Sequence, residues 1–561
     1  MVLLLVVLII SPSKEIKIGD KTILKISLQG KFIEEPGFSS ALRVLRSSVS
    51  KQINIWELID AIKRAQNDPN IKGIYLECGS ITAGWAQLTE LRKVLMDFKK
   101  SGKFIASYSE VYTQQTYYIA TVADEIFMHP EGYFLFKGLN MTIPFYKTLF
   151  DKLGIKPCVF RTGDYKSFVE PFILNGMSNE NRQQRNALLD DIYNNFINSV
   201  AEARHLTSSF LKKLAEDLSA ILPESIYNAQ LITSLGYKSD LDRLLKNKIN
   251  IESTKSISYV NFRDYGNKSM GTKNKKNQIA VLIAEGEIVD GKSKSNYIGS
   301  KDFTKVIKKL KADDSIKAVV LRINSPGGSA LASDTIWKEL CLLKGTKPIV
   351  ASMSNVAASG GYYMALACNK IYANIDSLTG SIGVFGLFFD AHLLLKNIGI
   401  TMDTVKTSKH ADIFENIGRP FDDYETCVIQ KSIEKTYDSF LSRVSHGRNL
   451  TIEEVKAVAS GRVWSGKAAK EKKLVDEIGG LDDAIASAAK LANVDLDNCS
   501  ITYWPSKPTF FEEIMADFKN IYCSKSFLQE VEKISPDFIH FQRLVNMRGI
   551  QARIPYDVEI R

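Results

Sequence analysis

An internal repeat limits the folds open to this chain more than any other feature. Residues 71–75 (Ile-Lys-Gly-Ile-Tyr) align with residues 316–320 (Ile-Lys-Ala-Val-Val) at an offset of 245. The offset holds without a gap through the pairs Ala106/Ala351, Tyr117/Tyr362, Gly138/Gly383 and Gly154/Gly399, and it is 244 at Tyr193/Tyr437. Because two copies are too few for a solenoid, we expect a duplicated domain.

Each copy alternates a helical pattern with a strand pattern. Residues 56–62 have the i, i+3, i+4 apolar spacing of a helix, and residues 71–76 form a continuous apolar run typical of a buried strand. The same pair recurs as a helix around residues 303–310 and a strand at residues 318–323. This alternation predicts an α/β fold with parallel sheets.

The repeat and a polar interruption predict the domain boundaries. Residues 263–277 are polar and contain glycines, which is typical of a linker. The expected division is a hydrophobic N-terminal segment at 1–15, a first copy at 16–262, a linker at 263–278, a second copy at 279–500 and a C-terminal extension at 501–561.

Composition excludes several classes of partner and cofactor. The chain has 561 residues, of which 45% are apolar and 24% charged, so it can bury large cores. Its net charge of +10 is spread over many lysines and forms no basic stripe interleaved with aromatics, so nucleic acid is not an expected partner. The excess positive charge is better suited to a weak attraction to anionic lipid. Seven cysteines with no close pair predict neither disulfides nor a zinc site. No metal or cofactor is expected.

Nine apolar residues follow Met1. A run of this length is too short to cross a bilayer, which needs about 20 residues. It is compatible with the remnant of a signal anchor, with a short signal core or with a first strand. We favour the truncated anchor.

Three turns rich in glycine and serine distinguish the second copy. They are residues 324–329 (Asn-Ser-Pro-Gly-Gly-Ser), 357–361 (Ala-Ala-Ser-Gly-Gly) and 379–383 (Thr-Gly-Ser-Ile-Gly). A serine between small residues can expose its hydroxyl, and neighbouring glycines can direct amides at a ligand. At the matching positions the first copy has Gln114 for Ser359, Thr82 and Ala83 for Gly327 and Gly328, and Phe136 for Ser381. If the two copies share one fold, the first copy therefore cannot present a serine nucleophile or the same pair of amides.

These motifs, together with residues 461–466 (Gly-Arg-Val-Trp-Ser-Gly) and 474–480 (Leu-Val-Asp-Glu-Ile-Gly-Gly), resemble the signal peptide peptidase A (protease IV) family in its long, double-domain form. This serine peptidase family is related in fold to the Clp protease and crotonase group. The resemblance implies that Ser359 is the nucleophile. It also implies that the base is the lysine of a Tyr-Lys-Ser…Glu-Pro-Phe motif, which is Lys166 in this chain.

The repeat tests the lysine assignment independently of the resemblance. Position 411, which corresponds to Lys166 in the second copy, is an alanine. The first copy thus keeps the lysine and lacks the serine, whereas the second keeps the serine and lacks the lysine. We expect an active site completed across both copies. Lys406 and Lys409 lie close to Ala411 but out of register, and they are the alternatives.

A Ser/Lys pair requires a neutral lysine, because an ammonium group cannot accept the proton of the serine. Burial can lower the pKa of a lysine from its usual value of about 10.4 toward 7–8. The resemblance points to Ser381 as the hydroxyl that orients the amine. The amide of Gly360 and one from the Gly327–Gly328 turn are the expected oxyanion donors.

Other readings of the chain stay open at this point. The histidines show no catalytic or metal-binding spacing, although His410 lies beside Ala411, and a Ser-His-Asp triad ranks below Ser/Lys. A crotonase-like acyl-CoA enzyme and a non-catalytic membrane scaffold are alternatives on the same fold. Trp464 is expected in the core, and Gly479–Gly480 as a helix stop.

The resemblance also implies a setting for the protein. It implies degradation of cleaved signal peptides and other apolar peptides at the bacterial inner membrane, with the catalytic part facing the periplasm. It further implies a homotetramer shaped like a bowl. Substrates would be extended and held by strand addition.

Overall fold

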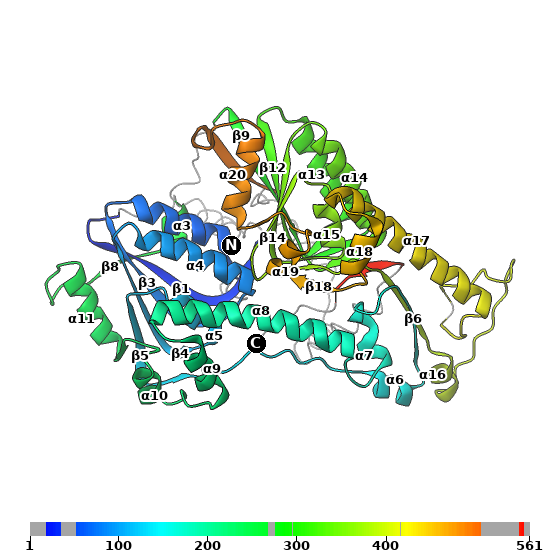
Figure 1. The fold of residues 1–561 in the computed structure, drawn as a ribbon, viewed down its shortest axis with the longest axis horizontal. Coiled ribbons are helices and arrows are strands. Elements are labelled where there is room, and N and C mark those ends of the chain that lie inside the picture. Colours follow the sequence, from blue (N-terminus) through cyan, green and yellow to red (C-terminus); the bar gives the residue numbers. More distant parts are fainter. Residues whose placement is uncertain are drawn as a thin grey trace, which may run out of the picture.

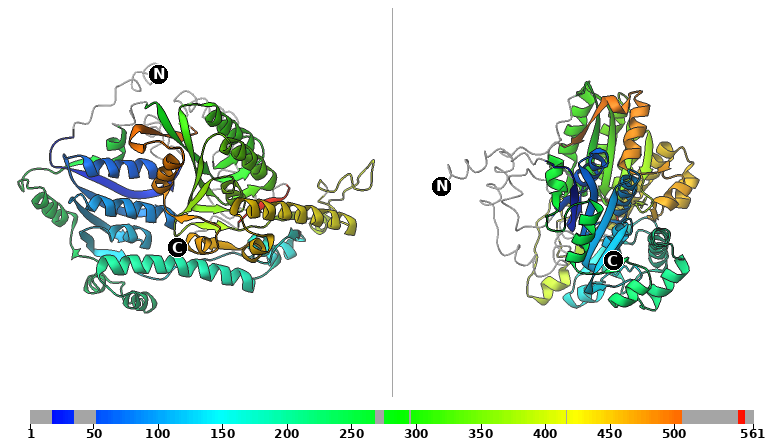
Figure 2. Two further views of the ribbon diagram at one scale, coloured as in Figure 1. Left: turned by 45° about the horizontal axis from the view of Figure 1, so that its top comes forward. Right: turned by 90° about the vertical axis from the view of Figure 1, so that its left-hand side faces the viewer.

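The computed structural model describes residues 18–34, 52–267, 275–293, 296–415, 417–505 and 549–554. It is an α/β structure with three sheets, and its two large sheets lie side by side (Figure 1; Figure 2, left). The predicted N-terminal segment lies outside the described residues, as do parts of the predicted linker and most of the C-terminal extension. Within the described part of the chain, no helix is both long and apolar enough to cross a membrane.

The first copy builds a sheet with the order β2-β1-β3-β4-β5-β7, in which β8 also pairs with β1 and every pairing is parallel. The strands are β1 (Thr22–Ile33), β2 (Gln52–Asn54), β3 (Ile71–Thr82), β4 (Phe104–Tyr112), β5 (Glu125–Phe134), β7 (Ser234–Leu235) and β8 (Ser258–Asn261). The helices are α3 (Ile55–Asn67), α4 (Trp85–Lys99), α5 (Gln114–Ala120), α6 (Lys147–Leu153), α7 (Glu170–Ile173), α8 (Asn179–Arg204), α9 (Ser208–Glu216), α10 (Pro223–Asn228), α11 (Lys238–Lys248) and α12 (Phe262–Asn267).

The second copy builds a sheet with the order β18-β16-β14-β12-β9-β20, in which β15 pairs with β14 and β19. Its strands are β9 (Asn277–Glu285), β12 (Ile316–Ser325), β14 (Ile349–Ala358), β15 (Lys370–Ala373), β16 (Leu378–Gly380), β18 (Val463–Ser465), β19 (Glu477–Ile478) and β20 (Cys499–Trp504). Its helices are α13 (Ser300–Ala312), α14 (Ala330–Lys344), α15 (Gly360–Ala365), α16 (His392–Asn397), α17 (Asp423–Arg448), α18 (Ile452–Val458), α19 (Gly466–Glu471) and α20 (Leu481–Leu491). The parallel α/β fold predicted from the sequence is confirmed.

A third, smaller sheet joins the two copies and reaches the candidate site. Its order is β11-β10-β13-β21-β17-β6. The strands are β6 (Lys156–Arg161), β10 (Glu287–Val289), β11 (Tyr297–Gly299), β13 (Gly327–Ser329), β17 (Phe385–Asp390) and β21 (Gln551–Arg553). Strand β6 comes from the first copy and runs antiparallel to β17 of the second. This pairing ties the segment that leads to Lys166 to the copy that contains Ser359.

Local sequence explains the elements that were predicted. Asn54 caps α3, because its side chain accepts hydrogen bonds from the amides of Trp56 and Glu57. Strand β3 is buried along most of its length, as expected for a parallel strand covered on both faces. The predicted helix at 303–310 and strand at 318–323 appear as α13 and β12.

The long helices show the repeat and its divergence. Helices α8 and α17 both have 26 residues, and they begin at matching positions of the sequence repeat. In Figure 1, α17 points away from the body, whereas α8 runs below both sheets. Helix α8 reaches the second copy, where the Gln184 side chain accepts a hydrogen bond from the amide of Val463 at 3.2 Å. The copies are therefore joined by α8 as well as by β6.

A buried ion cluster also connects the copies. Arg322 of β12 contacts Glu34 at 3.2 Å and Glu90 of α4 at 2.5 Å, and all three side chains are almost fully buried. The Arg322 guanidinium also lies 4.7 Å from the ring centroid of Trp56. Since a buried charge is costly when left unpaired, this cluster fixes the relative position of the two sheets.

Candidate active site

Ser359 lies at the junction of β14 and α15. Its backbone has φ 54° and ψ −112°, a conformation that residues other than glycine rarely adopt. The Ser359 amide donates to the Gly380 carbonyl at 2.8 Å, and its carbonyl accepts from the Tyr363 amide at 2.8 Å. These bonds maintain the sharp turn, and such strain tends to persist at functional positions.

The glycines after Ser359 are required by close packing. A Cβ at Gly361 would lie 2.7 Å from the Ser325 carbonyl oxygen, and one at Gly360 would lie 2.5 Å from Ser333 Oγ. The end of β12 and the first part of α14 therefore approach the start of α15 only because both residues lack side chains, and a Cβ at Gly327 of the turn would in turn lie 2.8 Å from the Gly360 nitrogen. This contact places the predicted oxyanion turn beside the nucleophile.

Lys166 follows β6 and precedes a short 3-10 helix (Ser167–Val169). Its Nζ lies 2.9 Å from Ser359 Oγ and 3.0 Å from Ser381 Oγ, and it also contacts the Ser381 carbonyl oxygen at 3.2 Å. The side chain is 1% exposed. The structure thus brings together the three side chains named from the sequence, one from the first copy and two from the second.

Burial sets the charge state of Lys166. Desolvation lowers the pKa of its amine well below the usual value. No ion pair links Lys166 to a carboxylate in the described part of the chain, so its charged form has no such compensation. The two serine hydroxyls instead surround the nitrogen, which suits a neutral amine that accepts a proton.

Glu170 holds the segment that carries Lys166. Its buried carboxylate accepts hydrogen bonds from the Ser178 hydroxyl at 2.6 Å and from the Asn181 side chain at 2.8 Å. Both partners lie at the start of α8, where Ser178 is the N-cap. The Tyr-Lys-Ser…Glu-Pro-Phe motif therefore combines a functional lysine with the glutamate that anchors its loop.

Gly461 and Arg462 are site residues that the sequence reasoning missed. A Cβ at Gly461 would lie 2.7 Å from Lys166 Cβ, so the glycine is packed directly against the lysine. The Arg462 carbonyl accepts from the Ser381 amide at 2.7 Å, and its guanidinium lies 4.2 Å from the ring centroid of Trp464. The sequence assigns no role to the Gly-Arg-Val-Trp motif, because a contact between this segment and Lys166 becomes visible only in the folded chain.

The two glycines of the turn after β12, Gly327 and Gly328, differ in their hydrogen bonding. The Gly327 amide donates to Ser325 Oγ at 3.2 Å and is used within the turn. Gly328 lies in β13 beside Ile288 of β10. The amides of Gly328 and Gly360 are therefore the candidate oxyanion donors.

The first copy has aromatic packing in place of a second site. Gln114, at the position of Ser359, has a side chain whose oxygen accepts from the Lys137 amide at 3.0 Å. Phe136, at the position of Ser381, is fully buried and packs on Tyr117 and Phe196. The first copy therefore has an amide and a phenyl ring at the two positions where the second copy has hydroxyl groups.

The alternative lysines point elsewhere. Lys406 pairs with Asp412 at 3.1 Å, and Lys409 pairs with Asp422 at 3.4 Å. Both carboxylates lie near the lysines in sequence, so these ammonium groups are retained in their own loop. Neither lysine contacts Ser359.

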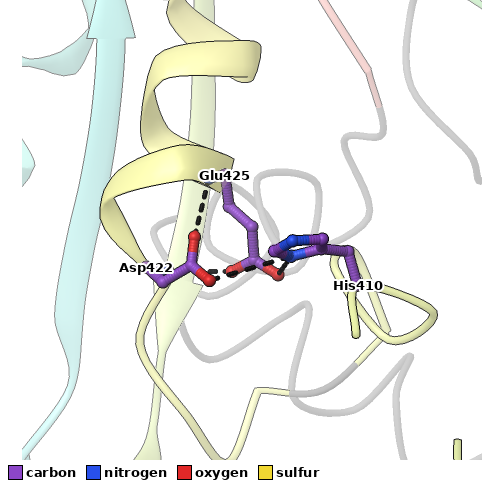
Figure 3. Close-up of side chains that lie close together, drawn as sticks. All are labelled: His410, Asp422 and Glu425. Atoms are coloured by element: carbon purple, nitrogen blue, oxygen red, sulfur yellow. Dashed lines mark hydrogen bonds and ion pairs between the residues drawn. The ribbon is translucent and has the colours of Figure 1, made fainter. Parts of the chain in front are cut away.

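His410 belongs to a partly buried ion network, shown in Figure 3 with Asp422 and Glu425, in which the Glu425 side chain is almost fully buried. His410 Nδ1 contacts Glu425 at 2.9 Å, and Arg419 contacts both oxygens of Glu425 at 2.8 Å. Arg419 lowers the pKa of Glu425 to about 2. The carboxylates are thus already neutralised by cations of the protein. Among the described residues no histidine contacts Ser359, which argues against a Ser-His-Asp triad.

Comparison with known proteins identifies the family. The model of peptidase family S49 matches residues 97–252 and 342–495, one region in each copy. The chain belongs to peptidase family S49. It is therefore a serine peptidase with two tandem S49 domains, and the region matched in the second copy contains Ser359 and Ser381.

Named relatives agree with the family match. The serine protease SPPA of Arabidopsis thaliana, described as chloroplastic, is 33% identical over 85% of this chain and 70% of its own length. Protease 4 of Haemophilus influenzae is 36% identical over 79% of this chain and 74% of its own length. A putative signal peptide peptidase SppA of Enterococcus faecium is 37% identical over 39% of this chain and 64% of its own length.

Proposed function

We propose that this S49 peptidase cleaves peptides with a dyad of Ser359 and Lys166 divided between its two copies. The observation that supports the proposal is the 2.9 Å contact between Lys166 Nζ and Ser359 Oγ in a buried setting. A serine needs a base within hydrogen-bond reach, and a neutral lysine can serve as one. Ser381 is proposed to orient the amine, since its hydroxyl lies 3.0 Å from the same nitrogen.

In the proposed reaction, Ser359 Oγ attacks the carbonyl carbon of the peptide while Lys166 accepts its proton. The developing oxyanion is held by the amides of Gly328 and Gly360. Lys166 then transfers the proton to the leaving amine as the C–N bond breaks. Water, deprotonated by the same lysine, hydrolyses the ester and restores Ser359.

The burial of Lys166 favours a catalytic role over a scaffold on the same fold. A lysine that is buried without a carboxylate partner reduces the stability of the folded state, because burial removes the ammonium form from water and gives it no compensating charge. A purely structural protein gains nothing from that cost. The acyl-CoA alternative also leaves a neutral amine beside a strained serine without a purpose, whereas peptide hydrolysis uses both groups.

We further propose that the substrates are cleaved signal peptides and other apolar peptides. The named signal peptide peptidase relative supports this substrate class, and the apolar residues 2–10 support an association with the bacterial inner membrane. A catalytic part facing the periplasm and a homotetrameric assembly complete the proposal. Both can be checked on the full-length protein by protease protection in spheroplasts and by light scattering.

The dyad is tested with a serine-reactive fluorophosphonate probe and a fluorogenic apolar peptide. Ser359→Ala should abolish labelling and hydrolysis. Lys166→Arg keeps a cation that cannot act as a base, and it should lower kcat/KM by about 10²–10⁴. Lys409→Arg is the matched control and should leave kcat/KM unchanged. Hydrolysis that survives in Ser359→Ala would overturn the dyad.

A further inference from the structure

A cavity of about 750 Å³ lies between the two copies, on the side of the first copy that corresponds to the candidate active site of the second. Its wall includes Thr82 and Gln114, which match Gly327 and Ser359 at the repeat offset. Thr82 ends β3, and Gln114 begins α5 directly after β4. In parallel α/β folds, ligands bind at this edge of the sheet. The cavity is therefore the first copy's counterpart of a peptide site, without the nucleophile.

The same cavity reaches the candidate active site. Asn324 and Pro326, which lead into the glycine turn, line it, and so does Val356, three residues before Ser359. Strand β13 begins one residue after Pro326, and it pairs antiparallel on the edge of this turn. A peptide added in the same sense has its carboxyl end toward Pro326. The residues that follow the cleaved bond would therefore enter the cavity.

The walls of the cavity suit an apolar peptide. The aromatic side chains of Phe32, Trp85 and Tyr112 contribute to them. Val111 and Tyr133 also lie in the wall, and these two side chains are 50% and 49% exposed. Ligand pockets are typically apolar with a few polar groups that fix the orientation of the ligand. Apolar surface is thus available here to the side chains of a bound peptide.

Two lysines of the first copy, Lys31 of β1 and Lys137 after β5, line the cavity as well. Within the described part of the chain, neither side chain forms an ion pair with a carboxylate. The main chain at Lys137 is held in place, because its amide donates to Gln114 Oε1 at 3.0 Å. The residue at the position of the nucleophile thus supports a segment that carries a cation.

The acidic residues of the cavity belong to the second copy and already have partners. Glu287 pairs with Arg553 at 2.9 Å, and Glu285 accepts a hydrogen bond from the Asn324 side chain at 3.2 Å. The Asp376 carboxylate accepts hydrogen bonds from side chains of α4 and α8 at 2.7 Å and 2.6 Å. Among the described residues, the charge left without a partner in this cavity is therefore positive. An anionic group on a ligand would complement it.

We propose that this cavity, here called the carboxylate pocket, binds the carboxyl-terminal segment of a substrate peptide, whose free α-carboxylate pairs with Lys31 and Lys137. A cleaved signal peptide ends in such a carboxylate, whereas the same segment inside an uncleaved precursor does not. The pocket selects released peptides and directs cleavage to a bond near that end. The inference rests on the proposed function, because it assumes that the bound peptide is cleaved at Ser359.

The test uses one fluorogenic apolar peptide in two forms, with a free carboxyl terminus and with a carboxyl-terminal amide. The unmodified protein should cleave the acid with an apparent KM about tenfold lower than that of the amide, because only the acid carries the anion. Lys31→Gln combined with Lys137→Gln should raise the KM of the acid to that of the amide and leave kcat unchanged. Equal KM values for the two forms in the unmodified protein, or a difference that survives in the double variant, would refute the carboxylate pocket.

Two further variants separate recognition of the carboxylate from a general effect of losing a lysine. Lys212→Gln removes an exposed lysine of α9 that donates to the Asn194 side chain, and it is the matched control. It should keep the tenfold difference between acid and amide. Lys137→Glu, which covers the case in which the double variant folds poorly, should reverse the order, because the new carboxylate repels that of the peptide. A lysine with a purely structural role would change the KM of both forms by the same factor, and that result also refutes the pocket.

Binding to the Ser359→Ala variant distinguishes a failure of this inference from a failure of the proposed dyad. Fluorescence anisotropy measures the Kd of the acid and of the amide on this variant without relying on hydrolysis at Ser359. A Kd about tenfold lower for the acid supports the pocket, and it does so even when the fluorophosphonate probe fails to label Ser359 in the unmodified protein, a result that rejects the dyad alone. Equal Kd values together with labelling of Ser359 reject the pocket alone.

Discussion

Lys166 Nζ lies 2.9 Å from Ser359 Oγ, although the two residues are 193 positions apart and belong to different copies of a duplicated domain. Neither copy contains both groups. The site therefore exists only while β6 stays paired with β17 and α8 stays packed on β18. Changes at the junction of the copies should affect catalysis as directly as changes at the dyad.

The pH dependence of hydrolysis should follow the titration of Lys166. The base works only when neutral, so kcat/KM should increase as the pH rises through the folded-state pKa of this amine and then level off. Desolvation holds that pKa well below the usual value, so the midpoint should lie well below about 10.4. A pH–rate profile of kcat/KM measures it. A midpoint near that of an ordinary lysine would contradict the assignment.

Lys166→Met should stabilise the protein while abolishing activity. Between the lowered folded-state pKa and the unfolded value, the unfolded chain binds a proton that the folded chain does not, so stability decreases as the pH falls through this window. Methionine removes that dependence. We expect the free energy of unfolding at pH 7 to rise by about 1 kcal/mol, as is common for replaced active-site residues. Urea unfolding at pH 7 and pH 10 should show a smaller gain at pH 10.

Gly461→Ala should displace the lysine. The new Cβ would lie 2.7 Å from Lys166 Cβ and from Lys166 N, so the loop that carries the base must move. A small misplacement of a reacting group can cost about a hundredfold in rate, and we expect kcat/KM to fall at least tenfold.

Gly399→Ala is the matched control for this change. Its φ of 82° is close to the 79° of Gly461, but a Cβ there would enter open space. Backbone strain is therefore similar in the two variants, while contact with the lysine is absent in the control. Equal activity losses in both would show that strain, and not displacement of Lys166, is responsible.

Arg322→Met should destabilise the junction of the copies. Removing the cation would leave Glu34 and Glu90 buried without it, which typically costs about 3–5 kcal/mol. The midpoint of urea unfolding should fall, and hydrolysis should be lost at a lower urea concentration than in the unmodified protein. Arg243→Met, which removes an exposed pair with Asp240, should change neither midpoint noticeably.

Much of the site could be predicted because its reacting residues lie in short, recognisable sequence motifs. Ser359 lies in a turn whose glycines are required by contacts with Ser325 and Ser333, so a recognisable motif marks the position. Gly461 carried a recognisable motif too, but its contact with Lys166 depends on how two distant loops pack. Strand β21 could not be predicted from the sequence, because its three residues (Gln-Ala-Arg) form no motif. They become a strand by pairing with the edges of β13 and β17.

The sequence by itself determined that the chain is a duplicated α/β protein and that each copy has lost a different part of one site. Those conclusions depend on periodicity and on the identity of residues at matched positions, both of which are properties of the chain alone. The tertiary structure alone decided that Lys166 reaches Ser359, that Lys406 and Lys409 do not, and that β21 pairs with β13 and β17. The physical reason is that contacts between distant segments depend on how the two copies pack against each other. The residues around one motif do not determine that packing.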